Sequence, residues 1–283
     1  MAQLLKGLAV ANALTGVLAE RADALKEKKV IPTLAIIRVG ERDDDISYET
    51  GAMKRCDKVG IAVRRFLLAA DCSKEELLDT IRAINEDETI HGCLMFRPLP
   101  DKAMEEAACE LLSPEKDVDG MTAGSLAAVF TGKGAGYPPC TAEACIELLD
   151  HYGIELQGKR VAVIGRSLVI GKPISMMLQA RNATVTMCHT KTVNMPEICR
   201  SAEILVVAAG KPKVIDSSFA SSGQIVVDVG IHVNEDGKLC GDVNLEDVEP
   251  IVEAITPVPG GVGSVTTAVL AKHVIEAAEK TAG

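Results

Sequence analysis

The sequence predicts an α/β protein with two α/β domains. The chain has 283 residues, which is long for one hydrophobic core and comfortable for two. Short runs of β-branched apolar residues alternate with helical patterns, an order typical of parallel sheets covered by helices. This alternation fails once, between residues 116 and 139, where five glycines indicate a crossing loop between two layers.

The first layer is predicted to run helix, strand, helix, strand, helix, strand. Leu14, Val17 and Leu18 share one face of the first helix, and Ser73 is a typical N-cap for the third. The expected helices cover residues 3–28, 47–60 and 74–85, and the expected strands cover residues 32–40, 61–68 and 92–96.

The second layer follows the crossing loop, which itself holds one short predicted helix at residues 123–129. Thr141 is expected to cap a regular helix that continues to residue 152. Further helices are expected at 173–178, up to residue 201 and at 265–280, with strands at 161–164, 183–189, 204–209, 225–230 and 254–257.

The turn after the strand at 161–164 is the strongest candidate for a binding site. Gly165, Arg166 and Ser167 lie between a buried strand and a helix, where backbone N–H groups and the helix dipole can hold a pyrophosphate. The usual Gly-x-Gly-x-x-Gly pattern is altered, because Ser167 replaces its second glycine and Gly171 comes late. An ordinary turn whose glycines only relieve crowding therefore stays open as an alternative.

The next strand ends without the acidic residue that an NAD site uses for the ribose 2′-hydroxyl. His189, Thr190, Lys191 and Thr192 stand there instead, and Arg166 lies in the preceding turn. Cationic and hydroxyl groups suit a 2′-phosphate. These residues favour NADP over NAD.

Composition excludes several classes of function. A net charge of −10 and a pI near 5.1 argue against a nucleic-acid partner, and no run of eighteen apolar residues indicates a membrane span. The first residues do not resemble a signal peptide, so we expect a cytoplasmic protein. Nine cysteines without a Cys-x-x-Cys pair predict reduced thiols and no metal site.

Several motifs together resemble the bifunctional methylenetetrahydrofolate dehydrogenase/methenyltetrahydrofolate cyclohydrolase family. They include Lys-Asp-Val-Asp-Gly at residues 116–120, the altered turn from Gly165 to Gly171, and Ile-Thr-Pro-Val-Pro-Gly-Gly-Val-Gly at residues 255–263. Pro-Cys-Thr at residues 139–141 and Asp-Val-Gly-Ile at residues 228–231 add to them. The similarity stays in register from the first helix to the last.

The resemblance implies a fold and an activity in one-carbon metabolism. It implies an N-terminal catalytic domain of residues 1–139 plus 265–283, a Rossmann-like NAD(P)-binding domain of residues 140–264, and a folate cleft between them. It also implies a homodimer formed through the nucleotide domains. The implied reaction is the oxidation of 5,10-methylenetetrahydrofolate with NADP, with NAD less favoured.

The resemblance also implies the site residues. Tyr48 would stack on the pterin and Asp119 would pair with its aminopyrimidine edge, as the two catalytic positions. Without the family, a tyrosine like Tyr48 is more often an interfacial packing residue, and an aspartate like Asp119 is more often a turn residue. The turn formed by Pro259, Gly260 and Gly261 would let backbone approach a flat ligand. The implied cofactor-binding residues are Thr141, Gly165, Arg166, Ser167, Gly171, His189, Thr190, Gly230 and Ile231.

Two catalytic positions of the family are altered in this chain. The family's lysine, four residues after the tyrosine, is Ala52, and its glutamine on the third strand is Phe96. The proline usual after Gly-Val-Gly is Ser264. We therefore expect a dehydrogenase whose cyclohydrolase (hydrolase) activity is weak or absent.

Three other readings stay open. Arg55, seven residues after Tyr48 on the same helix face, or Arg97, beside Phe96, could replace the family's lysine. Lys54 is disfavoured, because it lies some 120° around the helix from Tyr48. The chain could instead bind folate or nucleotide without turnover, as a degenerate subunit. It could also be a Rossmann dehydrogenase for another small substrate.

Overall fold

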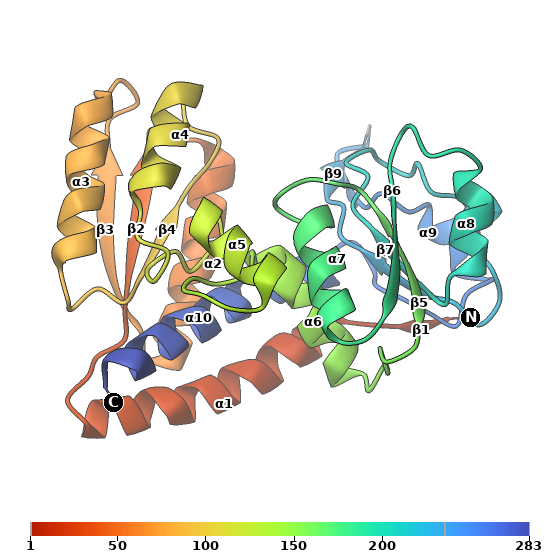
Figure 1. The fold of residues 1–283 in the computed structure, drawn as a ribbon, viewed down its shortest axis with the longest axis horizontal. Coiled ribbons are helices and arrows are strands. Elements are labelled where there is room, and N and C mark those ends of the chain that lie inside the picture. The colour runs from red at the N-terminus through yellow and green to blue at the C-terminus, as the bar shows by residue number, and fades with distance from the viewer. Residues whose placement is uncertain (1, 235, 283) are drawn as a thin grey trace. The chain divides into compact units, whose positions relative to one another are not determined.

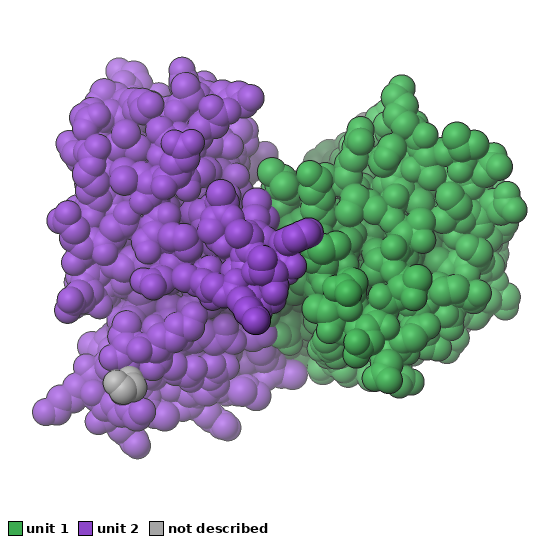
Figure 2. Space-filling view, in the orientation of Figure 1, with its two compact units in different colours: residues 1–11, 141–266 green, residues 12–140, 267–283 purple. Residues whose placement is uncertain are grey.

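The structure is a computed structural model that describes residues 2–234 and 236–282. Met1, Glu235 and Gly283, which the predicted domains include, lie outside the described residues. The chain divides into two compact units (Figures 1 and 2). Unit 1 comprises residues 1–11 and 141–266, and unit 2 comprises residues 12–140 and 267–283. Both units combine a parallel sheet with helices, which confirms the predicted α/β class.

Unit 1 is built on a six-stranded parallel sheet with the order β1-β11-β8-β7-β5-β6. The strands are β1 (Gln3–Leu4), β5 (Arg160–Ile164), β6 (Thr184–Cys188), β7 (Ile204–Val207), β8 (Ile225–Asp228) and β11 (Ala254–Ile255). The chain goes from β5 to the edge strand β6 and then returns to β7 on the other side of β5. Parallel sheets bind ligands at the carboxyl ends of the strands beside such a reversal.

Helices cover both faces of this sheet, as the unit shows in Figure 1. They are α6 (Cys140–His151), α7 (Gly171–Ala180), α8 (Met195–Ser201) and α9 (Leu245–Val248), and β9 (His232–Val233) pairs with β10 (Leu239–Cys240) in an antiparallel hairpin. Apolar residues of β5, β7 and β8 are fully buried, because both faces of a doubly covered sheet lie away from water.

Unit 2 has a three-stranded parallel sheet with the order β3-β2-β4. Its strands are β2 (Thr33–Val39), β3 (Ala62–Leu68) and β4 (Gly92–Met95). Its helices are α1 (Gly7–Glu27), which begins in unit 1, α2 (Asp43–Val59), α3 (Lys74–Glu86), α4 (Lys102–Leu111), α5 (Ala123–Thr131) and α10 (Thr266–Thr281). The central strand β2 is buried along its whole length.

The start of the chain differs from the prediction. Residues 3 and 4 were expected in the first helix, but they form β1, which pairs with β11 through Gln3 and Ala254, and α1 begins only at Gly7. Residues 1–11 therefore group with unit 1, whereas the predicted division placed them in the N-terminal domain.

Three helix starts also differ. Helix α2 begins at Asp43, because three aspartates in its first turn suit the positive end of the helix dipole. Thr141 lies inside α6, which begins at Cys140, so it is not the predicted cap. Helix α7 begins at Gly171 and not at Pro173. Helix α4 was not predicted; its N-cap is Asp101, whose carboxylate accepts from the Met104 N–H group.

Candidate functional site

The turn after β5 requires both of its glycines. Gly165 has a φ of +134°, and a Cβ added there would overlap the Ala208 carbonyl oxygen. A Cβ added to Gly171 would overlap the Gly165 carbonyl oxygen. The late glycine of the altered fingerprint is thus where α7 packs onto the end of β5, and both glycines relieve crowding within the turn.

The same turn presents donors to an anion. The Ser167 hydroxyl accepts from the Ile170 N–H group at 3.1 Å, which fixes the entry into α7. Within the described part of the chain, nothing forms an ion pair with Arg166, whose side chain is exposed, and the N–H groups of Arg166 and Ser167 donate to no partner. Free N–H groups beside the start of a ten-residue helix suit a phosphate.

The end of β6 lies beside this turn. Ile164 pairs with Cys188, so Arg166 and Thr190 each lie two residues beyond neighbouring strand ends. The His189 Nδ1 atom accepts from the Lys191 N–H group at 3.1 Å, so the neutral ring carries its hydrogen on Nε2. Residues 189–192, which follow β6, therefore offer hydrogen-bond donors and hydroxyl groups and contain no carboxylate.

The loop after β8 is held by two buried aspartates. Asp228 accepts from the N–H groups of Gly230 (2.9 Å), Asp242 (3.1 Å) and Val243 (2.9 Å). Burial raises the pKa of Asp228 to about 6, against the lowering effect of these donors. Gly230 packs against Asp242, where a Cβ would overlap its carboxyl group, and Ile231 beyond it is 63% exposed.

The turn of Pro259, Gly260 and Gly261 follows β11, at the carboxyl edge of the same sheet. Gly260 has a φ of +102°, and its carbonyl accepts from the Gly7 N–H group at 2.8 Å. Pro259 and Gly260 are exposed, so this turn offers backbone without side chains. Of the other predicted residues, Thr141 lies half-buried in α6.

In unit 2, the structure brings Tyr48 and Phe96 together. Tyr48 lies on α2 and Phe96 directly follows β4, and their rings meet edge to face with centroids 5.9 Å apart and an interplanar angle of 80°. Ala52 lies one helical turn after Tyr48 and is completely buried. The altered pair therefore adds an aromatic ring and a methyl group to the surroundings of Tyr48.

Asp119 is a half-buried carboxyl group with a strongly shifted pKa. Burial raises the pKa of Asp119 to about 6. The positive charge of Arg97 and a hydrogen bond from Cys140 act in the opposite direction, while nearby Asp117 raises the pKa further. The group can thus be neutral or ionised near physiological pH.

The two candidate replacement cations are held in different surroundings: Arg55 is bound by two threonines, whereas Arg97 lies near Asp119. The Arg55 guanidinium donates to the Thr15 hydroxyl at 2.5 Å and to the Thr267 hydroxyl at 3.5 Å, and burial lowers its pKa. Strand β4 ends at Met95, so Arg97 does not continue it; its Nη1 atom lies 3.9 Å from a carboxylate oxygen of Glu105.

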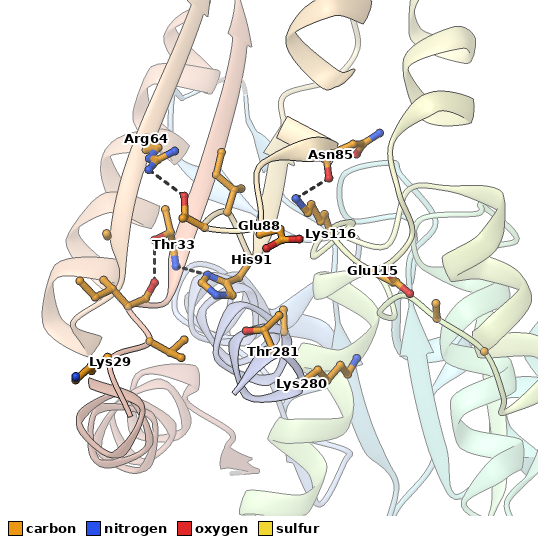
Figure 3. A pocket seen from close by; sticks show the side chains of 18 residues that line it. Lys29, Thr33, Arg64, Asn85, Glu88, His91, Glu115, Lys116, Lys280 and Thr281 are labelled. Atoms are coloured by element: carbon orange, nitrogen blue, oxygen red, sulfur yellow. Dashed lines mark hydrogen bonds between the residues drawn. The ribbon is translucent and has the colours of Figure 1, made fainter. Parts of the chain in front are cut away.

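The large cavity of unit 2, about 1230 Å³, is a different place (Figure 3). It lies at the amino ends of the strands, where Thr33, Ala62 and His91 line it, and no predicted site residue contributes. Its Lys116 ammonium donates to three carbonyl groups at the end of α3, those of Ile84, Asn85 and Asp87. That lysine therefore caps a helix.

Sequence reasoning missed Asp117 and His273. The buried Asp117 carboxylate accepts from the N–H groups of Met121 (3.0 Å) and Thr122 (2.7 Å) and from the Ser125 hydroxyl, which fixes the loop after Asp119. His273 lies in the core of unit 2 on α10. Asp117 had a sequence signal, its spacing of two from Asp119. His273 had none, because it belongs to no motif with other candidate site residues.

Residues 2–234 and 236–282 contain no group of three or more His, Cys, Asp or Glu side chains that could hold a metal ion. No helix in this part of the chain is long and apolar enough to cross a bilayer.

The reversed strand order and the open turn after β5 define unit 1 as a Rossmann-like nucleotide-binding domain. Residues 139–282 match the family model for the NAD(P)-binding domain of tetrahydrofolate dehydrogenase/cyclohydrolase, and residues 5–119 match the model for its catalytic domain. The chain belongs to the tetrahydrofolate dehydrogenase/cyclohydrolase family, which confirms the resemblance seen in the sequence.

Relatives match over the whole chain. The bifunctional protein FolD of Carboxydothermus hydrogenoformans is 48% identical over 281 residues, 99% of this chain and 98% of that protein. The crystal structure of the bifunctional FolD enzyme from Campylobacter jejuni has a TM-score of 0.95 at 36% identity and covers 99% of this chain and 100% of its own. FolD of Trypanosoma brucei, solved with NADP cofactor and an inhibitor, has a TM-score of 0.91 at 32% identity, covering 99% and 98%.

Proposed function

We propose that this chain oxidises 5,10-methylenetetrahydrofolate to 5,10-methenyltetrahydrofolate with NADP and has little or no cyclohydrolase activity. Family membership and the FolD relatives support the dehydrogenase part. The observation that carries the second part is the contact of Tyr48 with Phe96: α2 and the end of β4 meet, yet they bring together a phenyl ring and, one turn on, Ala52.

Tyr48 and Asp119 are the proposed folate residues of unit 2. A phenol ring can stack on a pterin, and an ionised carboxylate can accept two N–H groups from the aminopyrimidine edge. Pro259, Gly260 and Gly261 of unit 1 are proposed to contact folate; Pro259 and Gly260 are exposed, and Gly261 is buried behind them in the same turn. These roles rest on the matching family positions together with the burial and charge described above.

The turn of unit 1 fits NADP. Gly165 and Gly171 let the start of α7 pack closely against the end of β5, and the N–H groups of Arg166 and Ser167 are available to a pyrophosphate there. We propose that Arg166, with His189 and Thr190, binds the 2′-phosphate. Thr141, Gly230 and Ile231 remain proposed contacts at the edge of this site.

Oxidation of the substrate does not need an enzyme acid or base. When bound, NADP supplies the hydride acceptor, and a lone pair on a folate nitrogen stabilises the cation that the oxidation leaves. The residues of this chain then have to bind and orient the folate, which is a large part of catalysis for such steps. Loss of a lysine and a glutamine spares this reaction.

Hydrolysis of the methenyl product, unlike the oxidation, requires an acid or base group from the enzyme. Water has to be activated at the methenyl carbon by a group within hydrogen-bond reach. Alanine and phenylalanine side chains offer no such group. Arg55 is held by Thr15 and Thr267, which disfavours it as a substitute cation.

The test is an assay with methylenetetrahydrofolate and either NADP or NAD, followed by nicotinamide reduction. Turnover with a preference for NADP is expected. Folate binding by calorimetry without turnover with either nicotinamide would overturn the proposal and favour a non-catalytic folate-binding subunit. Saturable oxidation of a non-folate substrate alone would indicate a different dehydrogenase.

Arg166→Ala is expected to raise the Michaelis constant for NADP by roughly ten- to a hundredfold and to leave that for NAD nearly unchanged. A guanidinium bonded to the 2′-phosphate contributes about 1.5–3 kcal/mol, and NAD has no such phosphate. Initial rates with the two nicotinamides measure the difference. An equal effect on both cofactors would show that Arg166 does not read the phosphate.

A homodimer through the nucleotide-binding unit also remains a proposal. Ile231, Val233 and Leu239, at and beside the hairpin of β9 and β10, are apolar and 63%, 67% and 44% exposed. Exposed apolar side chains gathered on one hairpin are typical of an interface.

A further inference from the structure

We propose that His273 is a positioning residue for Asp119, acting through the Val118 carbonyl group. This inference rests on the proposed function, because it assumes that Asp119 binds the pterin edge. It assigns a role to a buried histidine that takes no part in the chemistry described above.

His273 makes a well-defined hydrogen bond. Its Nδ1 atom lies 2.8 Å from the Val118 carbonyl oxygen, and because a carbonyl only accepts, Nδ1 carries the hydrogen. The histidine and Val118 are both completely buried. The Cys140 thiol lies 3.2 Å from the same oxygen, but its single S–H is shared between this carbonyl and the Asp119 carboxyl group. An unsatisfied carbonyl would be costly at this depth, so the His273 donor holds its direction.

The imidazole ring is itself fixed. It stacks on Tyr137 with centroids 4.9 Å apart and an interplanar angle of 30°. The Tyr137 hydroxyl accepts from the Lys280 ammonium at 2.9 Å, and that ammonium lies 4.4 Å from the phenol ring centroid. A ring held on its face keeps Nδ1 aimed at one acceptor.

The Val118 carbonyl is well placed to orient Asp119. The carbonyl and the Asp119 nitrogen belong to one planar peptide unit, so fixing the carbonyl fixes the direction in which the backbone enters Asp119. The segment before it is also anchored: the Cys93 N–H group donates to the Lys116 carbonyl at 2.7 Å, and Asp117 forms a parallel bridge with Cys93. Gly120, with a φ of +68°, turns the chain immediately after. Asp119 therefore lies between two constrained peptides.

Two substitutions separate the hydrogen bond from the packing. His273→Asn places an amide nitrogen where Nδ1 lies, so it keeps the donor and loses the ring. His273→Phe keeps a ring that can stack on Tyr137 and loses the donor. His273→Gln also lacks a donor at that place, since its amide lies one bond further out, and serves if the phenylalanine variant does not fold.

We expect the Michaelis constant for methylenetetrahydrofolate to rise about tenfold in His273→Phe and His273→Gln, with that for NADP unchanged, and to stay within about threefold of the original in His273→Asn. Thermal unfolding of each variant confirms that it is folded. Equal losses in the Asn and Gln variants, or an unchanged folate constant in the donor-free variants, would overturn the role of His273. Absence of folate turnover in the unaltered protein would instead overturn the proposed function.

Discussion

Replacing Asp119 by alanine is expected to lower kcat/KM for methylenetetrahydrofolate by at least about a hundredfold. The carboxylate is proposed to accept two N–H groups from the pterin, and hydrogen bonds to a charged group contribute about 1.5–3 kcal/mol each. The dissociation constant for NADP should not change, because the proposed NADP residues belong to unit 1. Titration of the variant with NADP, beside steady-state folate kinetics, measures both effects. A normal folate constant would make Asp119 a simple turn residue.

The same carboxyl group gives this prediction a pH dependence. The pKa of Asp119 is raised to about 6 by burial, so the group is protonated below that pH and ionised above it. A protonated carboxyl cannot accept at both oxygens, and folate affinity should therefore fall as the pH drops through about 6. Asp119→Asn is the matched control: it should bind folate weakly, and its folate affinity should not change near pH 6. A fall in folate affinity near pH 6 that persists in Asp119→Asn would belong to another titrating group.

Restoring both altered positions is expected to give the largest gain of activity. The double variant Ala52→Lys with Phe96→Gln should raise cyclohydrolase activity by roughly 10²–10⁴-fold, the usual contribution of a placed acid–base group. Ala52→Lys alone should achieve less, because Phe96 would leave the ammonium beside a ring and without an orienting amide. Hydrolysis of added methenyltetrahydrofolate measures the gain.

The control for this experiment is the dehydrogenase rate of the same variants. Ala52 is completely buried, so a lysine there has to find room, and thermal unfolding shows whether it does. A double variant that is folded, retains dehydrogenase activity and still does not hydrolyse methenyltetrahydrofolate would contradict the proposed role of these two positions.

Most of the fold could be predicted because it depends on local patterns. The buried β-branched runs that form β2, β5, β7 and β8 are nearly continuous, as expected for strands covered on both faces. Strand β1 could not be predicted, because two residues without a local signal become a strand only by pairing with β11, about 250 residues later. Helix α4 was missed although it carries local signals: Asp101 caps it, and Met104 and Ala108, four residues apart, share its buried face.

The candidate site could likewise be predicted only where it depends on local sequence. Gly165 and Gly171 could be predicted as a tight turn between a strand and a helix, since the need for glycine there is a backbone property, and the structure explains the late glycine by its contact with Gly165. Their part in binding stays a prediction. Asp117 had a local signal in its spacing from Asp119, whereas the role of His273 could not be predicted from local sequence. His273 reaches the Val118 carbonyl across 155 positions of the chain, and that contact exists only after α10 has packed.

The central claim is tested most directly by the fate of the product. The unaltered protein is mixed with methylenetetrahydrofolate and NADP, and the amounts of NADPH and methenyltetrahydrofolate are compared over time, with the spontaneous hydrolysis rate subtracted. If the chain lacks cyclohydrolase activity, methenyltetrahydrofolate accumulates in equal amount to NADPH. If methenyltetrahydrofolate is hydrolysed as fast as NADPH forms, the account of Ala52 and Phe96 is wrong, and Arg97 becomes the first residue to test.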